Sequence, residues 1–121
     1  MNTKQREIML YKDFQDKYKN ELASCRTMYD VELLNKQNGK HWFDASSKRF
    51  FNSRTQNDPP YAGCIFVSSE KMGYAYDRCY TIRAILKDGT IETVSPFQYY
   101  ENRNTAHRHA MKLAEQIKQN K

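Results

Sequence analysis

The chain has 121 residues, a formal net charge of +6, nine tyrosines, six phenylalanines and one tryptophan. This aromatic content excludes a disordered chain, because rings bury large apolar areas on folding. No stretch approaches the roughly 20 apolar residues of a membrane span, and the polar N-terminal residues are unlike a signal peptide. We therefore expect one cytoplasmic domain over residues 1–121, without a membrane partner, whose charge favours an anionic partner.

Residues 1–38 are predicted to be a helical N-terminal region. A helix capped by Thr3 and extending to about residue 24 places five apolar side chains on one arc. These are Ile8, Tyr11, Phe14, Tyr18 and Leu22. Residues 29–37 then form a second, shorter helix or, alternatively, a strand, and Asn38-Gly39 ends this element.

Residues 40–54 alternate aromatic with basic side chains. Trp42 and Phe43 suit a short strand, and Phe50 and Phe51 follow a possible single helical turn. Alternation of this kind is typical of RNA or single-strand binding, in which rings stack on bases and cations contact phosphates. Large aromatic side chains are more commonly core residues, so burial of all four is the alternative interpretation.

Three β-rich runs predict an antiparallel meander: residues 64–70, 79–86 and 90–95. Asp88-Gly89 favours a two-residue type I′ turn between the last two runs, because both central residues of that turn need positive φ. With residues 41–43 the sheet would have four strands.

This turn determines which side chains share a face of the hairpin, since it sets Leu86 opposite Ile91 and Ala84 opposite Thr93. The more apolar face, expected to meet a helix, comprises Tyr80, Ile82, Ala84, Leu86 and Ile91. The mixed face, expected to be exposed, comprises Thr81, Arg83, Ile85, Glu92 and Val94.

A C-terminal amphipathic helix begins near Asn102 or Asn104, either of which can cap it. Its core stripe comprises Ala106, Ala110, Leu113, Ala114 and Ile117. The predicted fold class is α+β, with an N-terminal helix or helices, an antiparallel three- to four-stranded meander and a C-terminal helix packed on one sheet face. Residues 40–118 hold the meander and that helix.

Catalytic and metal-binding patterns are scarce in this sequence. His107 and His109 would point about 200° apart on a helix, which excludes a shared metal ion. No catalytic triad or glycine-rich phosphate loop is evident, so we expect a non-enzymatic protein without a metal or cofactor. The three cysteines, Cys25, Cys64 and Cys79, are expected to be reduced thiols.

Basic side chains around the hairpin and the start of the helix form the candidate site for nucleic acid or another anionic partner. The candidate residues are Lys48, Arg49, Arg54, Lys71, Arg78, Arg83, Arg103, Arg108 and Lys112. The helix N-terminus near Arg103 and Arg108 would add to the binding of a phosphate. Scattered solvated cations are the alternative interpretation.

Several short segments form a further pattern over about residues 39–115. They are His41-Trp-Phe, Arg49-Phe-Phe-Asn-Ser-Arg54, Ser68-Ser-Glu-Lys71, Tyr80-Thr-Ile-Arg83, Asp88-Gly89, Ile91-Glu-Thr-Val94, Phe97-Gln98 and Ala106-His107-Arg108. Together they resemble a group of small uncharacterised proteins encoded by phages and other mobile elements. The resemblance implies a bacterial cytoplasm and a role in controlling host or element functions, including host defence.

A looser resemblance concerns only the order strand, turn, strand, Phe97 and alanine-rich helix. It is similar to the three-stranded-sheet DNA-binding domains of plant ethylene-response factors and phage integrases, which lay the sheet in the major groove. The face that holds Thr81, Arg83 and Glu92 has fewer basic side chains than this mode of DNA binding requires. The Glu92 carboxylate would also face phosphate.

The predicted function is a non-enzymatic mobile-element accessory protein that binds nucleic acid or a host nucleoprotein, with anti-CRISPR-like inhibition as one form. The alternative is a protein–protein adaptor that acts through the N-terminal helix or the aromatic stretch 42–51. Trp42, Phe50 and Phe51 would then lie at the interface. The sequence does not predict the oligomeric state.

Overall fold

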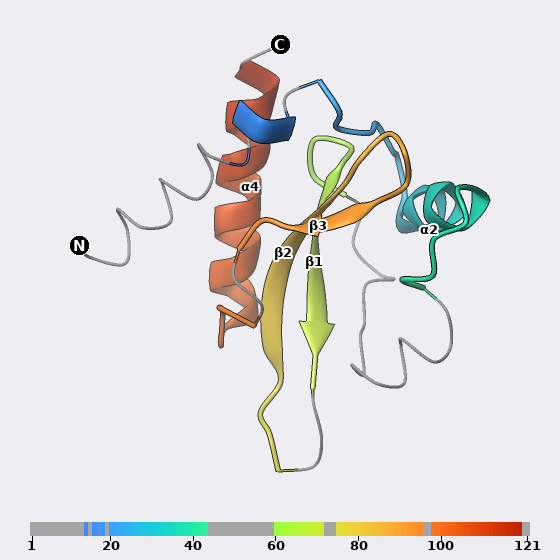
Figure 1. Cartoon of the computed structure of the whole chain (residues 1–121). Helices are drawn as coiled ribbons and strands as arrows, with labels where there is room; N and C mark the ends of the chain where they lie inside the picture. Colours follow the sequence, from blue (N-terminus) through green and yellow to red (C-terminus); the bar gives the residue numbers. More distant parts are fainter. Residues whose placement is uncertain are drawn as a thin grey trace.

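The computed structural model describes residues 14, 16–18, 20–43, 60–71, 75–95 and 98–119. Its labelled elements are α2 (Met28–Gln37), β1 (Ile65–Glu70), β2 (Cys79–Ile85), β3 (Ile91–Thr93) and α4 (Arg103–Gln119). The strands form an antiparallel sheet in the order β1-β2-β3, and α4 packs against β1 and β2 (Figure 1). The predicted α+β class, with the C-terminal helix on the sheet, is confirmed.

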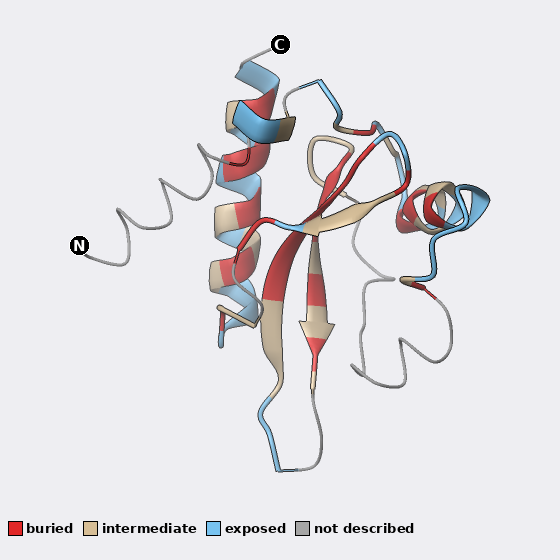
Figure 2. Ribbon diagram, viewed as in Figure 1, coloured by how far each residue is buried: buried red, intermediate tan, exposed pale blue. Residues whose placement is uncertain are grey.

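Helix α4 follows the predicted pattern closely. Asn102 caps it, because its Oδ1 accepts hydrogen bonds from the backbone N–H groups of Asn104 (2.8 Å) and Thr105 (3.2 Å). The whole predicted stripe is buried, while the outward side of the helix is exposed (Figure 2). Three of the five stripe residues are alanines, whose small side chains permit a close approach to the sheet.

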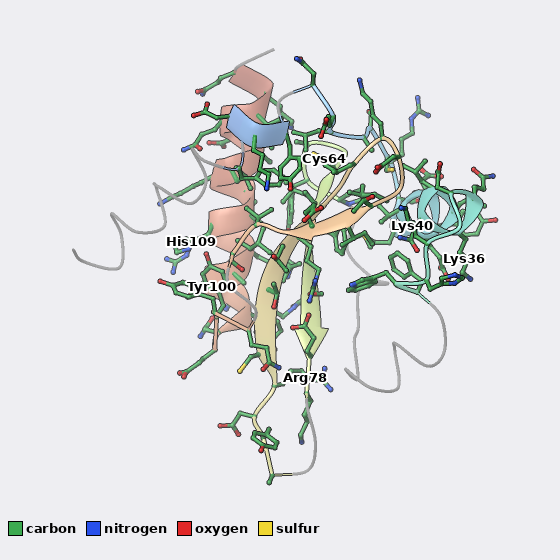
Figure 3. The ribbon with its side chains drawn as sticks, viewed as in Figure 1. Lys36, Lys40, Cys64, Arg78, Tyr100 and His109 are labelled. Carbon is green, nitrogen blue, oxygen red and sulfur yellow. The ribbon has the colours of Figure 1, made fainter. Side chains whose placement is uncertain are left out.

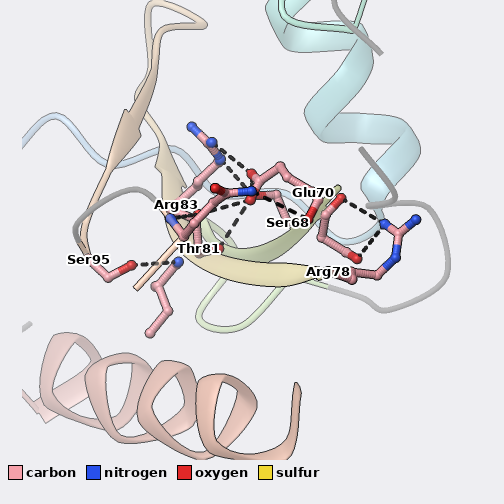
Figure 4. Close-up of polar contacts among 9 residues, drawn as sticks. Ser68, Glu70, Arg78, Thr81, Arg83 and Ser95 are labelled. Carbon is pink, nitrogen blue, oxygen red and sulfur yellow. Dashed lines mark hydrogen bonds and ion pairs between the residues drawn. The ribbon is translucent and has the colours of Figure 1, made fainter. Parts of the chain in front are cut away.

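Helix α2 begins with a capping box that excludes the alternative strand. Thr27 Oγ1 accepts from the Asp30 N–H at 3.2 Å, and Asp30 Oδ2 accepts from the Thr27 N–H at 3.1 Å. Asn38 and Gly39 follow its last turn as predicted, and Gly39 has a φ of 73°. Figures 1 and 4 show α2 on the opposite side of the sheet from α4, so each sheet face has a helix on its side.

The turn between β2 and β3 has three residues rather than the predicted two. The Leu86 N–H donates to the Thr90 carbonyl (2.8 Å), and the Gly89 N–H donates to the Leu86 carbonyl (2.9 Å). Within this turn Gly89 alone has positive φ, at 85°, so a type I turn followed by a left-handed glycine replaces type I′. Asp88 favours this loop because its carboxylate accepts from the Thr90 N–H at 3.0 Å. The same hydrogen bond lowers the pKa of Asp88.

The additional loop residue moves the pairing by one position. Ile85 pairs with Ile91, Ala84 with Glu92 and Arg83 with Thr93. Because strand side chains alternate, every side chain of β3 lies on the face opposite to the predicted one. Ile91 therefore shares its face with Arg83, not with the α4-facing residues.

Gly89 lies against α2, which gives a test of this packing. A Cβ at Gly89 would lie 2.8 Å from the Leu34 carbonyl oxygen and 2.9 Å from Asn38 Cβ, whereas one at Gly39 would meet nothing within 4 Å. Gly39→Ala should cost about 1–2 kcal/mol for its left-handed backbone alone. Gly89→Ala should cost about 1 kcal/mol more, because the clash adds to a similar backbone penalty. Urea denaturation of both variants measures the difference, and equal losses would contradict the contact between α2 and the turn.

Asn35 provides a second link between α2 and the hairpin. This residue is buried, and its Nδ2 donates to the Gly89 carbonyl at 2.8 Å. Val31, one turn earlier, is fully buried in the core. Asn35 thus links α2 to the hairpin turn, and Val31 on the same side of the helix packs in the core.

The N-terminal helix ends earlier than predicted. Residues 16–18 are helical, residues 20–21 form a turn, and Leu22 forms an antiparallel bridge with Leu86. The Ala23 N–H donates to the Ile85 carbonyl (3.1 Å), and the Lys87 N–H donates to the Glu21 carbonyl (2.7 Å). Pairing with the end of β2 replaces the predicted last helical turn. The predicted cap at Thr3 lies outside the described residues.

Of the two alternatives, three or four strands, the structure has the three-stranded form over the described residues, and residues 41–43 are not a strand. Residues 42–43 form a turn, in which Phe43 is buried and Trp42 half-buried. The part of the chain described here has a three-stranded sheet. The remaining candidates of the aromatic and basic stretch lie outside the described residues: Lys48, Arg49, Phe50, Phe51 and Arg54.

Strand β3 is shorter than predicted because a bulge follows it. The N–H groups of Val94 and Ser95 both donate to the Ile82 carbonyl, at 2.8 and 3.3 Å. Two residues thus oppose one, which ends regular pairing. The chain then returns to β2, where Tyr100 and Tyr80 exchange backbone hydrogen bonds of 2.7 and 3.1 Å.

Candidate nucleic-acid interface

Arg83, expected on an exposed face, is instead part of a buried ion pair. Its Nη2 lies 2.8 Å from Glu70 Oε1. Glu70 is fully buried and Arg83 is 7% exposed. The expectation of an exposed anion-binding Arg83 is therefore corrected, because this guanidinium already neutralises a carboxylate inside the protein.

The neighbours of this pair complete its hydrogen bonding (Figure 4). Arg83 Nε donates to Ser68 Oγ (2.7 Å), and that hydroxyl donates to Glu70 Oε1 (2.5 Å). Thr81 Oγ1 donates to Glu70 Oε2 (3.0 Å) and accepts from the Gln98 N–H (2.8 Å). A buried ion pair is tolerated when its remaining donors and acceptors are satisfied in this way.

Trp42 covers the network on the side away from α4. The Arg83 guanidinium carbon lies 5.1 Å from the centre of the Trp42 ring, which also contacts the Phe66 ring edge-on at 6.0 Å. This stack assigns Trp42 to the packing of the sheet face. It also closes the face that a sheet-in-groove mode of DNA binding would use, since Thr81 and Arg83 lie beneath it.

Lys71 and Arg78 lie at the end of β1 and the start of β2 and are half-buried. Arg78 Nη1 donates to Ser69 Oγ at 2.9 Å. Beside Arg78 is an open pocket of about 490 Å³, lined by Tyr76, Asp77, Arg78, Cys79, Gln98 and Glu101. Partial burial and then the carboxylates of Glu101, Asp77 and Glu70 raise the pKa of the Cys79 thiol. Because Asp77 and Glu101 line the pocket together with Arg78, its charge is mixed rather than uniformly positive.

The remaining predicted cations belong to α4, and Arg103, Arg108 and Lys112 are all exposed. Arg108 and Lys112 lie on its outward side, while Arg103 is its first residue. Lys118, in the last turn, is exposed as well. We call these four residues the α4 cations. Glu115 is the single carboxylate of the helix, whose first turn has no acidic residue to offset its positive end.

The two histidines of α4 lie on its flanks, as their spacing predicts. Each is near a tyrosine hydroxyl: His107 Nδ1 lies 2.5 Å from Tyr61 Oη, and His109 Nδ1 lies 3.0 Å from Tyr100 Oη (Figure 3). These contacts hold the helix between the loop before β1 and the segment that pairs with β2. Over the described residues, no group of three or more His, Cys, Asp or Glu side chains is placed to hold a metal ion.

Comparison with known proteins gives a family and no activity. Residues 27–111 match the family described as "Family of unknown function (DUF7447)". The chain belongs to this family. The DUF7447 match spans α2, the whole sheet and the first half of α4, and so includes Arg103 and Arg108. No curated protein and no solved structure matches the chain. In the described part of the chain, no helix is long and apolar enough to cross a membrane.

Proposed function

We propose that this DUF7447 protein is a non-enzymatic nucleic-acid-binding protein whose anionic partner lies against the α4 cations. The observation that carries the proposal is the charge balance of α4, which has four exposed cations and one carboxylate. Helix α2 has the reverse balance, with Lys36 against Asp30 and Glu32, and Lys36 is paired with Glu32 at 3.0 Å. An excess of cations along one helix is the usual electrostatic footprint of a phosphate backbone.

Two features support binding rather than catalysis. Burial, followed by the charge of Asp30, raises the pKa of the Cys25 thiol, so both partly exposed cysteines favour the unreactive protonated form. The buried carboxylate of Glu70 is occupied by Arg83, Ser68 and Thr81. The two thiols are therefore weak nucleophiles, and the Glu70 carboxylate is not accessible as a general base.

The resemblance to proteins of phages and mobile elements supports a proposal about where the protein acts. We propose that the protein acts in the bacterial cytoplasm on host or element nucleic acid, alone or within a nucleoprotein. Inhibition of a nucleic-acid-guided defence complex is one activity of this kind.

The salt dependence of binding tests the role of the α4 cations. Arg108→Ala/Lys112→Ala should weaken binding to a labelled duplex and lower the log–log salt slope by about 0.9 for each phosphate that is no longer neutralised. The control is Lys36→Ala/Lys40→Ala, which removes the same charge beside α2 on the other side of the sheet (Figure 3). Fluorescence anisotropy between about 50 and 200 mM salt measures both pairs. Unfolding free energies should stay within about 0.5 kcal/mol, since all four side chains are exposed.

Two outcomes would contradict the proposal. Equal slopes for the two double variants would mean that net charge, and not α4, drives binding. Absence of binding by the wild-type protein at low salt would exclude direct nucleic-acid recognition.

A protein–protein adaptor is the second candidate, and exposed apolar side chains on α2 favour it. Tyr29 is 69% exposed and Leu33, one turn later, is 39% exposed. Trp42, by contrast, packs on Arg83 and Phe66, so it is poorly placed to serve as an interface residue. In this case a partner would be captured with little salt dependence, and Tyr29→Ser/Leu33→Ser would abolish capture.

A further inference from the structure

The outward side of α4 presents a continuous row of polar and amphipathic side chains. Its members share one face of the helix and are all exposed. They are Asn104, Arg108, Met111, Lys112, Glu115 and Gln119. At about 1.5 Å per residue the row spans roughly 22 Å of helix. We call it the α4 row.

The composition of the row matches the contacts that distinguish base pairs. Asparagine and glutamine pair with adenine N6 and N7, and glutamate accepts from cytosine N4. Met111 adds an apolar surface suited to a thymine methyl group. A purely electrostatic phosphate surface needs only cations, and Glu115 in the middle of the row would oppose it. The mixture of donors and acceptors therefore indicates base edges as well as phosphates.

Other features of α4 favour duplex DNA over single strands or RNA. Single-strand binding relies on exposed rings, and residues 103–119 contain no Phe, Tyr or Trp. The rings beside the helix, Tyr61 and Tyr100, face His107 and His109 edge-on. The major groove of duplex RNA is too narrow for a helix, whereas that of B-DNA is about 12 Å wide and admits one.

We propose that α4 lies in the major groove of duplex DNA, with the uncharged and acidic members of the α4 row toward base edges and the α4 cations toward the phosphates on either side. This inference rests on the proposed function and adds two points, which are the groove of the DNA that α4 occupies and the base edges that its side chains contact. Arg103 and Lys118 suit phosphates because they lie at opposite ends of the helix, away from the centre of the row.

A selection from random duplexes, followed by base substitution, tests the groove. The wild-type protein should enrich a short site and bind it about tenfold more tightly than the matching single strand or RNA duplex. Replacing the purines of that site with 7-deazapurines removes the N7 acceptor from the major groove and keeps base pairing. This change should weaken binding about tenfold, because bidentate contacts use N7. Unchanged affinity would overturn major-groove reading.

Glu115→Gln distinguishes recognition of a base edge from a general effect of charge on affinity. A contact from Glu115 to cytosine predicts that the variant loses the preference for one base pair of the selected site. Electrostatics alone predicts an equal gain in affinity for every sequence. Glu32→Gln on α2 is the matched control and should leave the sequence preference unchanged. The uniform gain would overturn base reading by Glu115.

The outcomes also separate this inference from the proposed function. Equal binding of duplex DNA, single strands and RNA, still dependent on Arg108 and Lys112, would reject the groove and retain the α4 cations as the binding surface. Binding that is indifferent to Arg108 and Lys112 in every nucleic acid would reject both.

Discussion

Arg83→Ala is expected to lower the free energy of unfolding by about 3–5 kcal/mol, which is the usual cost of removing one partner of a buried ion pair. The substitution leaves the Glu70 carboxylate in the interior with two hydroxyl donors, from Ser68 and Thr81, and no opposite charge. It also removes the cation from the face of Trp42. Trp42 is the single tryptophan of the chain, so its fluorescence reports the change directly in urea titrations.

Two further variants make the result specific to the ion pair. Arg78→Ala removes a half-buried guanidinium that donates to the neutral Ser69 hydroxyl, and it should cost about 1 kcal/mol. Arg83→Met/Glu70→Leu removes both charges and should recover much of the stability, because apolar side chains of similar size often replace a buried pair without penalty. A destabilisation by Arg83→Ala no greater than that by Arg78→Ala would show that the pair is not buried in solution.

Leu113→Ala should cost about 2–5 kcal/mol. Leu113 is fully buried and belongs to the same core cluster as Ile65 and Ile82 of the sheet. The alanine leaves a cavity that the neighbouring alanines of α4 are too small to fill. Chemical denaturation measures the decrease in stability.

Met111→Ala is the control for Leu113→Ala on the same helix. Met111 is 51% exposed, so its truncation should change stability by no more than about 0.5 kcal/mol. Similar destabilisation by the two variants would mean that α4 does not cover the sheet in solution.

Local patterns predicted α4 correctly and offered a helix as one of two alternatives for α2, because such signals lie within a few residues of each other. The spacing of Ala106, Ala110 and Leu113 is visible in a short stretch of the chain, as is the cap at Asn102, whereas the structure shows the capping box at Thr27. Such signals need no knowledge of the rest of the fold.

Contacts between distant residues explain the errors. Asp88-Gly89 is compatible with a two-residue and a three-residue turn, and packing against Asn35 and Leu34 of α2 accompanies the three-residue form. The burial of Arg83 requires Glu70 from another strand and Trp42 from the loop after α2. A period-two pattern indicates which side chains share a face, and it does not reveal that both faces are covered.

The candidate site was predicted in part. Arg108 and Lys112 lie on an exposed helix face as their spacing indicates, while Arg103 and Lys118 are exposed near the two ends of α4. Arg83 differs because it is buried, whereas Lys71 and Arg78 are half-buried at the end of the sheet. Charge sign is evident from sequence, whereas exposure and neighbouring charge depend on the fold.

The bridge between Leu22 and Leu86 means that the sequence family and the folding unit have different boundaries. The family match begins at Thr27, after the segment that hydrogen-bonds to Ile85 and Lys87 at the end of β2. It ends at Met111, before Leu113 and Ile117 of the core. A fragment cut at these limits would expose one end of β2 and half of the apolar surface beneath α4. Domain-exchange experiments on this family should therefore transfer residues 14–119 as a unit, because Phe14 also belongs to the core.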